Sequence, residues 1–181
     1  MADVTVSAIP DRVPAKPDAL TASEEPTWDV IELLFFAYRD FVDDADDVLA
    51  HYGFGRAHHR VLHFVYRHPG MKVADLLDIL KITKQSLGRV LKQLIDQEFV
   101  EQKEGANDRR QRLLFVTAKG ETLALKLAGL QTTRITRALG ELGTGSHEAA
   151  RRFLLAMINP ESRDGVLRLI ARADRIRGAR R

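Results

Sequence analysis

Basic and amide side chains gather on one short stretch of the chain, and their types indicate binding to a polyanion. Between Lys81 and Gln93 the sequence contains no acidic residue, whereas an ordinary solvated helix face, the alternative interpretation, usually mixes both signs of charge. Guanidinium and amide groups can make paired hydrogen bonds to base edges, and ammonium groups pair with phosphates. The polar residues predicted to share one exposed helix face are Lys84, Gln85, Ser86, Arg89 and Lys92.

Two short helices joined by a tight turn are predicted to present this polar face. Residues 73–80 and 84–97 both place apolar side chains at helical spacing, and only a few residues separate them. Thr83 stands at the N-cap position of the second helix, where its hydroxyl can accept a hydrogen bond from the backbone of Ser86. Helices connected by a turn of three to four residues form the helix-turn-helix arrangement, whose second helix enters the DNA major groove.

A β-hairpin with an arginine-rich tip is predicted directly after the second helix. Residues 99–103 alternate weakly between apolar and polar types, residues 104–108 have turn composition, and residues 113–116 have high β-propensity. Arginine is attracted by the negative potential of a narrow minor groove, so the hairpin suits a position beside a duplex. The charged residues at and beside its tip are Asp108, Arg109, Arg110 and Arg112. Asp108 is unexpected there, because its carboxylate repels phosphates.

The composition is that of a globular protein with an uneven distribution of charge. The chain has 181 residues, of which 45% are hydrophobic and 29% charged, and this length suits one domain or two closely packed subdomains. In residues 1–50, 12 acidic and three basic side chains give −9, whereas in residues 51–181, 25 basic and 13 acidic side chains give +12. The basic part indicates a polyanionic partner, and solvated faces of unlike sign are the alternative.

Several functional classes are disfavoured by what the sequence lacks. It has no cysteine, which excludes a thiolate nucleophile and a cysteine-based metal or redox site. No apolar run approaches the ~18 residues of a membrane span, and the first residues do not form a signal pattern. No phosphate-binding loop, nucleophile elbow or metal motif is present. We therefore expect a cytoplasmic protein that is not an enzyme, needs no cofactor and has no membrane partner.

Histidines are concentrated in and around a second predicted helix, residues 56–67. Five of the six histidines lie within 18 residues. The spacing of His59 and His63 would place both on one helix face, which is compatible with metal binding. The sequence offers no HExxH motif and no nearby acidic cluster to complete such a site, so no metal site is predicted.

The outer parts of the chain are predicted to be a tail and further helices. Residues 1–26 contain four of the six prolines and suggest a mobile tail. Residues 28–49 form a helix with a wide aromatic stripe, which faces either the core or a partner chain. Residues 118–140 form another helix, Ser146 can cap a helix that runs to Met157, and a last amphipathic segment covers residues 166–176.

The whole pattern resembles the MarR family of winged helix-turn-helix transcription regulators over residues 28–158. The resemblance is carried by the run Leu87-Gly88-Arg89-Val90-Leu91-Lys92-Gln93-Leu94, by Phe99-Val100, by Asp108-Arg109-Arg110 and by the pair Thr117 and Gly120. One departure is Glu98, which stands where the family usually has glycine. The helix before it should therefore end without a left-handed glycine cap.

The resemblance implies a mainly α fold with a small β-wing, made of a winged helix-turn-helix lobe and a helical dimerisation region. It also implies a homodimer on a palindromic duplex DNA operator, in most cases as a repressor. The expected segments are a flexible tail at 1–26, a helix of the dimerisation region at 27–52, the DNA-binding lobe at 53–117, a linker helix and dimerisation helix at 118–158, and an arginine-rich helical extension at 159–181.

Within the family pattern, individual residues acquire expected roles. Gln85 and Arg89 are expected to read bases, and Lys84 and Ser86 to contact bases or phosphates. Lys92, like Arg109 and Arg112, is expected to contact phosphate. Asp108 either braces Arg110, the expected minor-groove reader, or only makes the turn. A small aromatic or anionic effector is expected in a crevice to which these residues contribute, if they do not simply pack in the core: Phe35, Tyr38, Arg39, His58, His59, His63 and Tyr66.

Two alternatives of function remain open at the level of sequence. A winged helix can serve as a protein-interaction module for which DNA is irrelevant, and a DNA-binding regulator can act constitutively without an effector. Salt-sensitive binding to duplex DNA separates the first alternative from a regulator. Thermal stabilisation of the protein by a candidate ligand would separate a regulator with an effector from a constitutive one.

Overall fold

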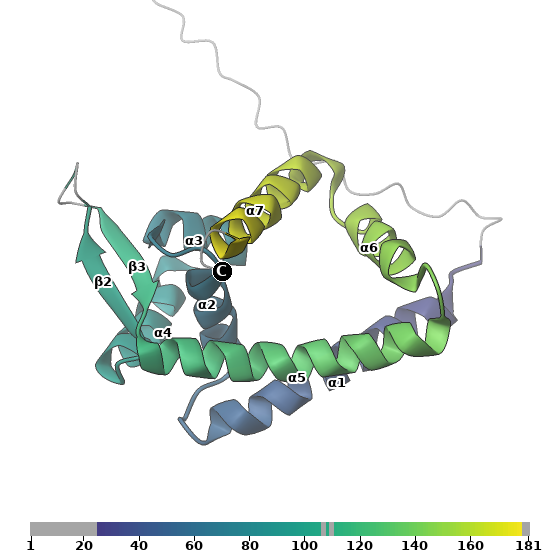
Figure 1. Ribbon diagram of the computed structural model, residues 1–181, viewed down its shortest axis with the longest axis horizontal. Helices are drawn as coiled ribbons and strands as arrows, with labels where there is room; N and C mark the ends of the chain where they lie inside the picture. Colours follow the sequence, from purple (N-terminus) through teal and green to yellow (C-terminus); the bar gives the residue numbers. More distant parts are fainter. Residues whose placement is uncertain (1–24, 106–107, 109–110, 179–181) are drawn as a thin grey trace, which may run out of the picture. The chain divides into compact units, whose positions relative to one another are not determined.

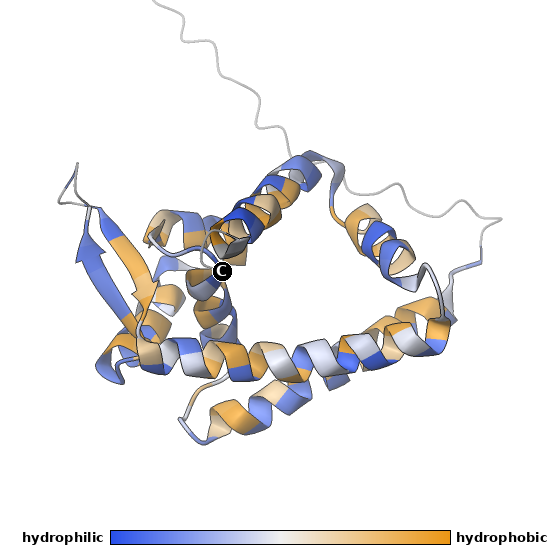
Figure 2. Ribbon diagram, in the orientation of Figure 1, coloured by the Kyte–Doolittle hydropathy of each residue, from blue (hydrophilic) through white to orange (hydrophobic). Residues whose placement is uncertain are grey.

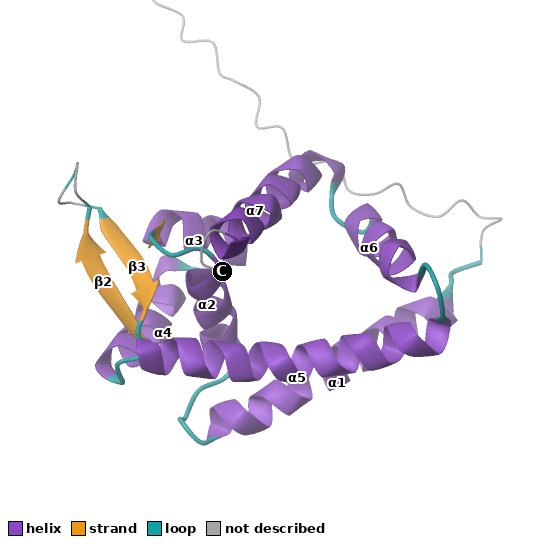
Figure 3. Ribbon diagram, in the orientation of Figure 1, coloured by secondary structure: helices purple, strands orange, loops and turns teal. Residues whose placement is uncertain are grey.

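The computed structural model describes residues 25–105, Asp108 and residues 111–178. Figures 1 and 3 show a chain of helices with one small sheet. Its elements are α1 (Trp28–Ala50), α2 (Arg56–Arg67), β1 (Met71–Lys72), α3 (Val73–Leu80), α4 (Lys84–Asp96), β2 (Val100–Glu104), β3 (Arg112–Val116), α5 (Ala118–Leu142), α6 (Ser146–Ala156) and α7 (Pro160–Gly178). This mainly α architecture with a small sheet is the predicted fold class. The predicted tail, residues 1–26, lies almost entirely outside the described residues.

The chain divides within α1 into two compact units, residues 1–36 and 37–181. In the first unit, the start of α1 exposes large apolar side chains, among them Trp28, Leu33 and Phe35, which are 63, 65 and 69% exposed. In the second unit, the remainder of α1 buries Val42 and Leu49. The aromatic stripe of residues 28–49 is therefore core only over its second half.

The hydrophobic core of the second unit lies among α1, α2, α3, α4, the sheet and the start of α5. Figure 2 shows that these helices carry both hydrophobic and hydrophilic residues along their length. This amphipathic spacing drives the helices to pack, because burying their apolar stripes removes that surface from water. The most completely buried side chains of this core are Leu49, Val61, Leu62, Val65, Leu76, Leu87, Leu94, Phe99, Val100, Leu114 and Leu127.

The wing is a three-stranded antiparallel sheet in the order β1-β3-β2 rather than the simple hairpin predicted from the sequence. The β2–β3 register runs from Val100 opposite Val116 to Glu104 opposite Arg112. The additional strand β1 has two residues and pairs Met71 with Leu114. A two-residue strand carries no alternation from which it could have been predicted, and it forms because the core holds it against β3.

The junction between the wing and α5 explains why threonine and glycine occur three residues apart. Thr117 caps α5 by accepting a hydrogen bond from the backbone N–H of Gly120 at 3.1 Å, and its hydroxyl donates to the carbonyl of Glu98 at 2.6 Å. A Cβ added at Gly120 would lie 1.9 Å from the carbonyl oxygen of Phe99. Only glycine therefore allows α5 to approach the backbone of Phe99, just before β2, this closely.

The end of α4 corrects one sequence-based expectation. Glu98 adopts a left-handed conformation, with φ of 60°, so the chain turns as a glycine cap would turn it although glycine is absent. The backbone N–H groups of Glu98 and Phe99 donate to Ile95 and Leu94 at 2.9 and 2.8 Å. The left-handed conformation costs a non-glycine residue about 1–2 kcal/mol, and these turn contacts hold it in place.

The two C-terminal helices also differ in detail from the prediction. Ser146 is not the cap of α6: Gly145 takes that position, and the Ser146 hydroxyl donates to the Leu139 carbonyl of α5 at 2.9 Å. Pro160 ends the preceding segment as expected, but it is also the first residue of α7, where a missing N–H is harmless. Helix α7 is consequently longer than the predicted segment 166–176.

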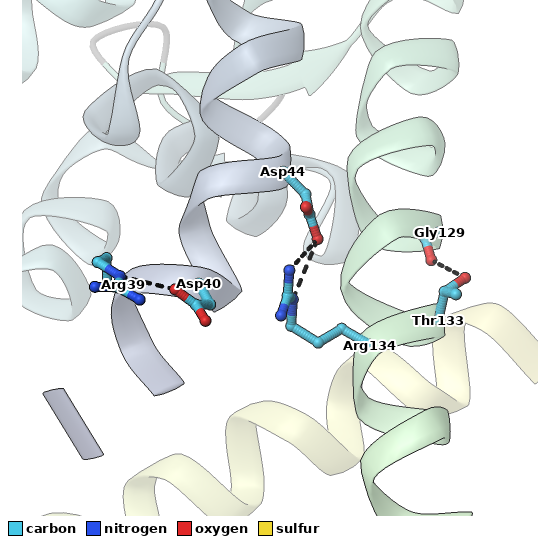
Figure 4. A network of polar contacts seen from close by, with 6 residues as sticks. All are labelled: Arg39, Asp40, Asp44, Gly129, Thr133 and Arg134. Carbon is cyan, nitrogen blue, oxygen red and sulfur yellow. Dashed lines mark hydrogen bonds and ion pairs between the residues drawn. The ribbon is translucent and has the colours of Figure 1, made fainter. Parts of the chain in front are cut away.

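Polar contacts join helices within the second unit. Asp44 of α1 accepts two hydrogen bonds from the Arg134 guanidinium of α5, at 2.9 and 3.2 Å, as Figure 4 shows. Arg67 of α2 pairs with Asp174 of α7 at 2.8 Å, next to the buried Ala173. Among the helices of the described residues, none has the length and apolar character needed to cross a membrane.

Candidate nucleic-acid interface

The predicted helix-turn-helix is formed by α3, a short turn and α4. The turn begins at Lys81, which is left-handed with φ of 50°, and ends at Thr83, whose hydroxyl accepts a hydrogen bond from the Ser86 N–H at 3.1 Å. The Thr83 cap is the one predicted from the sequence. The buried face of α4 consists of the four predicted residues Leu87, Val90, Leu91 and Leu94. Its orientation on the lobe is therefore fixed by the core, and its polar face is exposed.

Three of the predicted DNA-contacting side chains have no partner among the described residues. Lys84, Gln85 and Arg89 are exposed, and no hydrogen bond or ion pair joins their side chains to another residue of the described part of the chain. Lys84 and Gln85 lie in the first turn of α4, and Arg89 follows one turn later. Two cations and one amide of this kind are available to base edges or phosphates without first breaking an internal contact.

Two other predicted contacts on α4 are already engaged. The Ser86 hydroxyl accepts a hydrogen bond from the Thr83 hydroxyl at 2.9 Å. Lys92 pairs with Asp96 one turn further along α4, at 2.6 Å. Both members of this ion pair are exposed, so the pair is weak, on the order of 0.3–0.5 kcal/mol. A phosphate can displace Asp96, but the ion pair between Lys92 and Asp96 must break before Lys92 can bind it.

Gln93 is a residue of this face that the sequence analysis did not assign to DNA binding. It lines an open hollow of about 490 Å³ together with Ser86, Arg89, Val90 and Lys92. Its side-chain oxygen lies 2.6 Å from Nε2 of His58, at the start of α2. A contact between residues 35 positions apart in the sequence leaves no local pattern, so no feature of the sequence could have shown it.

The described part of the wing carries balanced charges. Arg112 pairs with Glu104 across the two strands at 3.1 Å, and Lys103 pairs with Glu101 at 2.7 Å. The Asp108 carboxylate accepts a hydrogen bond from the side-chain amide of Gln111 at 3.4 Å. Arg109 and Arg110 lie outside the described residues, so the predicted brace between Asp108 and Arg110 stays a prediction.

The predicted effector residues lie on α1 and α2 and fall in both compact units. Phe35 belongs to the first unit, and Arg39 pairs with its neighbour Asp40 at 2.8 Å (Figure 4). Tyr38 is 55% exposed. On α2, His58 contacts Gln93, His59 is buried, His63 is exposed and Tyr66 packs partly against the core. Among the described residues, no group of three or more histidine, aspartate or glutamate side chains is placed to hold a metal ion.

Three histidines of this region are held in the neutral form by their surroundings. Desolvation and the nearby positive charges lower the pKa of His63 to about 4. Burial lowers the pKa of His59, partly opposed by the nearby Asp46 carboxylate. Burial also lowers the pKa of His68, which is 5% exposed, and the positive charges of Arg67 and Arg172 add to the effect. The Nδ1 atom of His68 is buried without a hydrogen-bond partner among the described residues. These groups therefore resist protonation in the folded chain.

Comparison with known sequences places the lobe in a known group of proteins. A model of the MarR family matches residues 52–111, which include α2, α3, α4 and β2. The HTH-type transcriptional regulator PetP of Rhodobacter capsulatus is 44% identical over 133 residues, which are 74% of this chain and 80% of PetP.

Solved structures show the same fold at lower identity. The crystal structure of MarR aligns over 89% of this chain and 99% of its own, at 20% identity and a TM-score of 0.57. A MarR transcriptional regulator from Methanosarcina mazei aligns over 75% of this chain and 90% of its own, at 21% identity and a TM-score of 0.61. A mutant of S. aureus MepR, bound to an oligodeoxyribonucleotide, aligns over 74% of this chain and 96% of its own, at 18% identity and a TM-score of 0.52.

Proposed function

Because this chain belongs to the MarR family of DNA-binding transcription regulators, which are not enzymes, we propose that it acts as a homodimeric repressor on a palindromic operator. In this proposal, α4 of each protomer enters the major groove of one half-site. Arg89 and Gln85 read bases, while Lys84 and Lys92 contact phosphates. The wing lies beside the adjacent minor groove, where Arg110 is the proposed reader.

The observation that carries the proposal is the state of the polar face of α4. An exposed helix face normally satisfies part of its charge through neighbouring side chains, as Lys92 does with Asp96. Lys84, Gln85 and Arg89 instead lack partners among the described residues, and no acid lies between Lys81 and Gln93. A row of unpaired donors on a helix fixed by the core matches the acceptor-rich floor and rim of the major groove.

The proposed dimer is supported by exposed apolar side chains on helices outside the DNA-binding lobe. On α6, Phe153 and Leu154 are 51 and 59% exposed, and Leu142 at the end of α5 is 73% exposed. The start of α1 exposes Trp28 and Phe35 to a similar degree. Exposed apolar side chains in such number are typical of surfaces that bind another chain.

Binding-site selection by the purified full chain from a library of random duplexes tests this function. The expected result is a site with dyad symmetry, bound with an affinity that falls steeply as salt concentration rises, because bound counterions are released from the phosphates. Half-site centres should be about one helical turn, ~10 base pairs, apart. Salt-insensitive binding, or no enrichment of any sequence, would contradict the proposal and favour a protein-interaction module.

Constitutive DNA binding is the alternative to release by a small aromatic or anionic ligand, and two contacts in the structure bear on the choice. Two of the polar groups expected to bind such a ligand are occupied, because Arg39 pairs with Asp40 and His58 contacts Gln93. This observation favours a constitutive DNA binder. A thermal-shift screen with aromatic carboxylates decides: stabilisation together with weaker DNA binding supports an effector, and no change with any compound supports the constitutive form.

A further inference from the structure

In the hydrogen bond between His58 of α2 and Gln93 of α4, a single backbone group determines which atom donates and which accepts. The backbone N–H of Gly55 lies 3.1 Å from Nδ1 of His58. A backbone N–H can only donate, so Nδ1 must accept and carries no proton. The proton of the neutral imidazole is then on Nε2, the atom that lies 2.6 Å from the Gln93 side-chain oxygen.

The orientation of the Gln93 amide follows from this tautomer. Because Nε2 carries the proton, it donates, and only the carbonyl oxygen of the Gln93 amide can accept. The NH₂ end of the amide must then point away from His58. No other hydrogen bond of the Gln93 side chain is formed with the described residues, so both of its N–H groups are available.

The His58 ring is itself held in place by packing. It stacks on the buried ring of Phe54, with centroids 4.7 Å apart and an angle of 9° between the planes. Phe54 in turn makes an edge contact with Phe99, at a centroid distance of 5.2 Å, and Phe99 is fully buried in the core. The position of the Gln93 carbonyl is thus tied to the core through two aromatic rings and one imidazole.

We propose that His58 is a positioning residue that holds the carbonyl of Gln93 toward α2, so that the NH₂ group of Gln93 is the end that faces DNA and Gln93 contacts DNA as a hydrogen-bond donor. A free glutamine offers a donor and an acceptor, and this pair matches N7 and N6 of adenine. Held by His58, Gln93 can match acceptors alone: the guanine N7 or O6 atoms, or a phosphate oxygen. The hollow that Gln93 lines with Arg89 and Lys92 then presents donors from all three side chains.

This inference rests on the proposed function, and a double-mutant cycle measures it directly. Gln93→Met removes the amide at similar length. His58→Phe keeps the stack on Phe54 but removes both ring nitrogens, which frees the Gln93 carbonyl. The four proteins are titrated with the selected operator and with random duplex. His51→Phe and Gln131→Met, which replace the same residue types at the end of α1 and on α5, are the matched controls, and thermal melting verifies that each variant is folded.

We expect Gln93→Met to lower operator affinity about fivefold in the wild-type background. In the His58→Phe background, the same substitution should change operator affinity by a clearly different factor. If the acceptor is a base, site selection with His58→Phe gains adenine at one position of each half-site, and adding Gln93→Met abolishes that gain. If the acceptor is a phosphate, Gln93→Met weakens operator and random duplex equally only while His58 is present. The same change in both backgrounds would overturn the inference.

A measurement without DNA separates this inference from the proposed function. The ¹⁵N resonances of the His58 ring in the full chain should report a neutral imidazole with its proton on Nε2, and a proton on Nδ1 would overturn the assignment. If Arg89→Ala and the wild type both fail to distinguish operator from random duplex, the proposed function fails whatever the tautomer. If the wild type does distinguish operator from random duplex but the double-mutant cycle shows no coupling between His58 and Gln93, only the proposed role of His58 is wrong.

Discussion

At the scale of single residues, the side chains on the DNA-facing side of α4 differ in how strongly they are already held. Arg89 has no partner among the described residues, whereas Lys92 pairs with Asp96 at 2.6 Å. Asp96 therefore competes with phosphate for Lys92, and its negative charge also repels the phosphate. We expect Asp96→Asn to raise affinity for any duplex about two- to fivefold, measured by titration at constant salt.

A matched control for that change lies on α3. Asp78 pairs with Lys81 in a similarly exposed ion pair at 2.5 Å, and Asp78→Asn should alter DNA affinity less because Lys81 precedes α4. In the wild type, Lys92→Ala should flatten the dependence of log affinity on log salt by about one unit, since one phosphate contact is lost. Equal effects of Asp96→Asn and Asp78→Asn would show that Lys92 makes no special contact.

Glu98 gives a prediction about stability at the same scale. Its left-handed φ of 60° is strained for any residue with a Cβ, and its side chain is exposed. We expect Glu98→Gly to raise the free energy of unfolding by about 1 kcal/mol, measured by urea denaturation. Gln97→Gly, at the neighbouring residue with an ordinary φ of −94°, should lower it. A loss of stability in both variants would indicate that the Glu98 side chain has an undetected stabilising role.

At the scale of elements, α2 connects the core to both the reading helix and the C-terminal helix. His59 on α2 and His68 directly after it are buried, and their pKa values are lowered in the folded chain. In the unfolded chain they return toward the ordinary value of 6.5, so the unfolded chain binds more protons below that pH. Stability contributed by the neutral histidines is fully present above about pH 6.5 and is lost as the pH falls through the folded-state values.

We therefore expect the free energy of unfolding to decrease between pH 7 and pH 5, and His68→Phe to make this decrease smaller. The substitution removes one titrating group and keeps an aromatic ring next to Phe64, on which His68 stacks. Urea denaturation at several pH values measures both slopes. His51→Phe, which removes an exposed histidine, is the control. An unchanged slope in His68→Phe would show that another group causes the pH dependence.

The elements that the sequence predicted best are those whose evidence is local. The bounds of α2 and α3 and the buried face of α4 follow from apolar spacing over one or two turns, and Thr83 is a local cap. Neither β1 nor the contact between His58 and Gln93 was predicted, because both depend on residues distant in the sequence. The predicted cap of α6 was wrong because the Ser146 hydroxyl bonds to α5 instead.

At the scale of the whole molecule, the proposal requires two copies of the chain. The exposed apolar residues of α1, α5 and α6 would be costly to leave in water. We expect the purified protein to sediment as a dimer and Leu154→Glu, in the middle of an exposed apolar face, to shift it toward monomer. Operator affinity should then fall by at least tenfold, because two half-sites are no longer bound together. Arg151→Gln, which changes the charge by the same one unit at a nearby exposed site, controls for charge alone. A monomeric wild type would contradict the dimer.

The central claim is that α4 reads sequence through side chains that are free in the absence of DNA, with Arg89 foremost. The most direct measurement is the affinity of Arg89→Ala for the selected operator and for random duplex at the same salt concentration. We predict a loss on the operator equivalent to roughly 1–3 kcal/mol, with relaxed preference at one base position per half-site and a much smaller loss on random duplex. Equal losses on both duplexes would contradict the account, because Arg89 would then contact only the backbone.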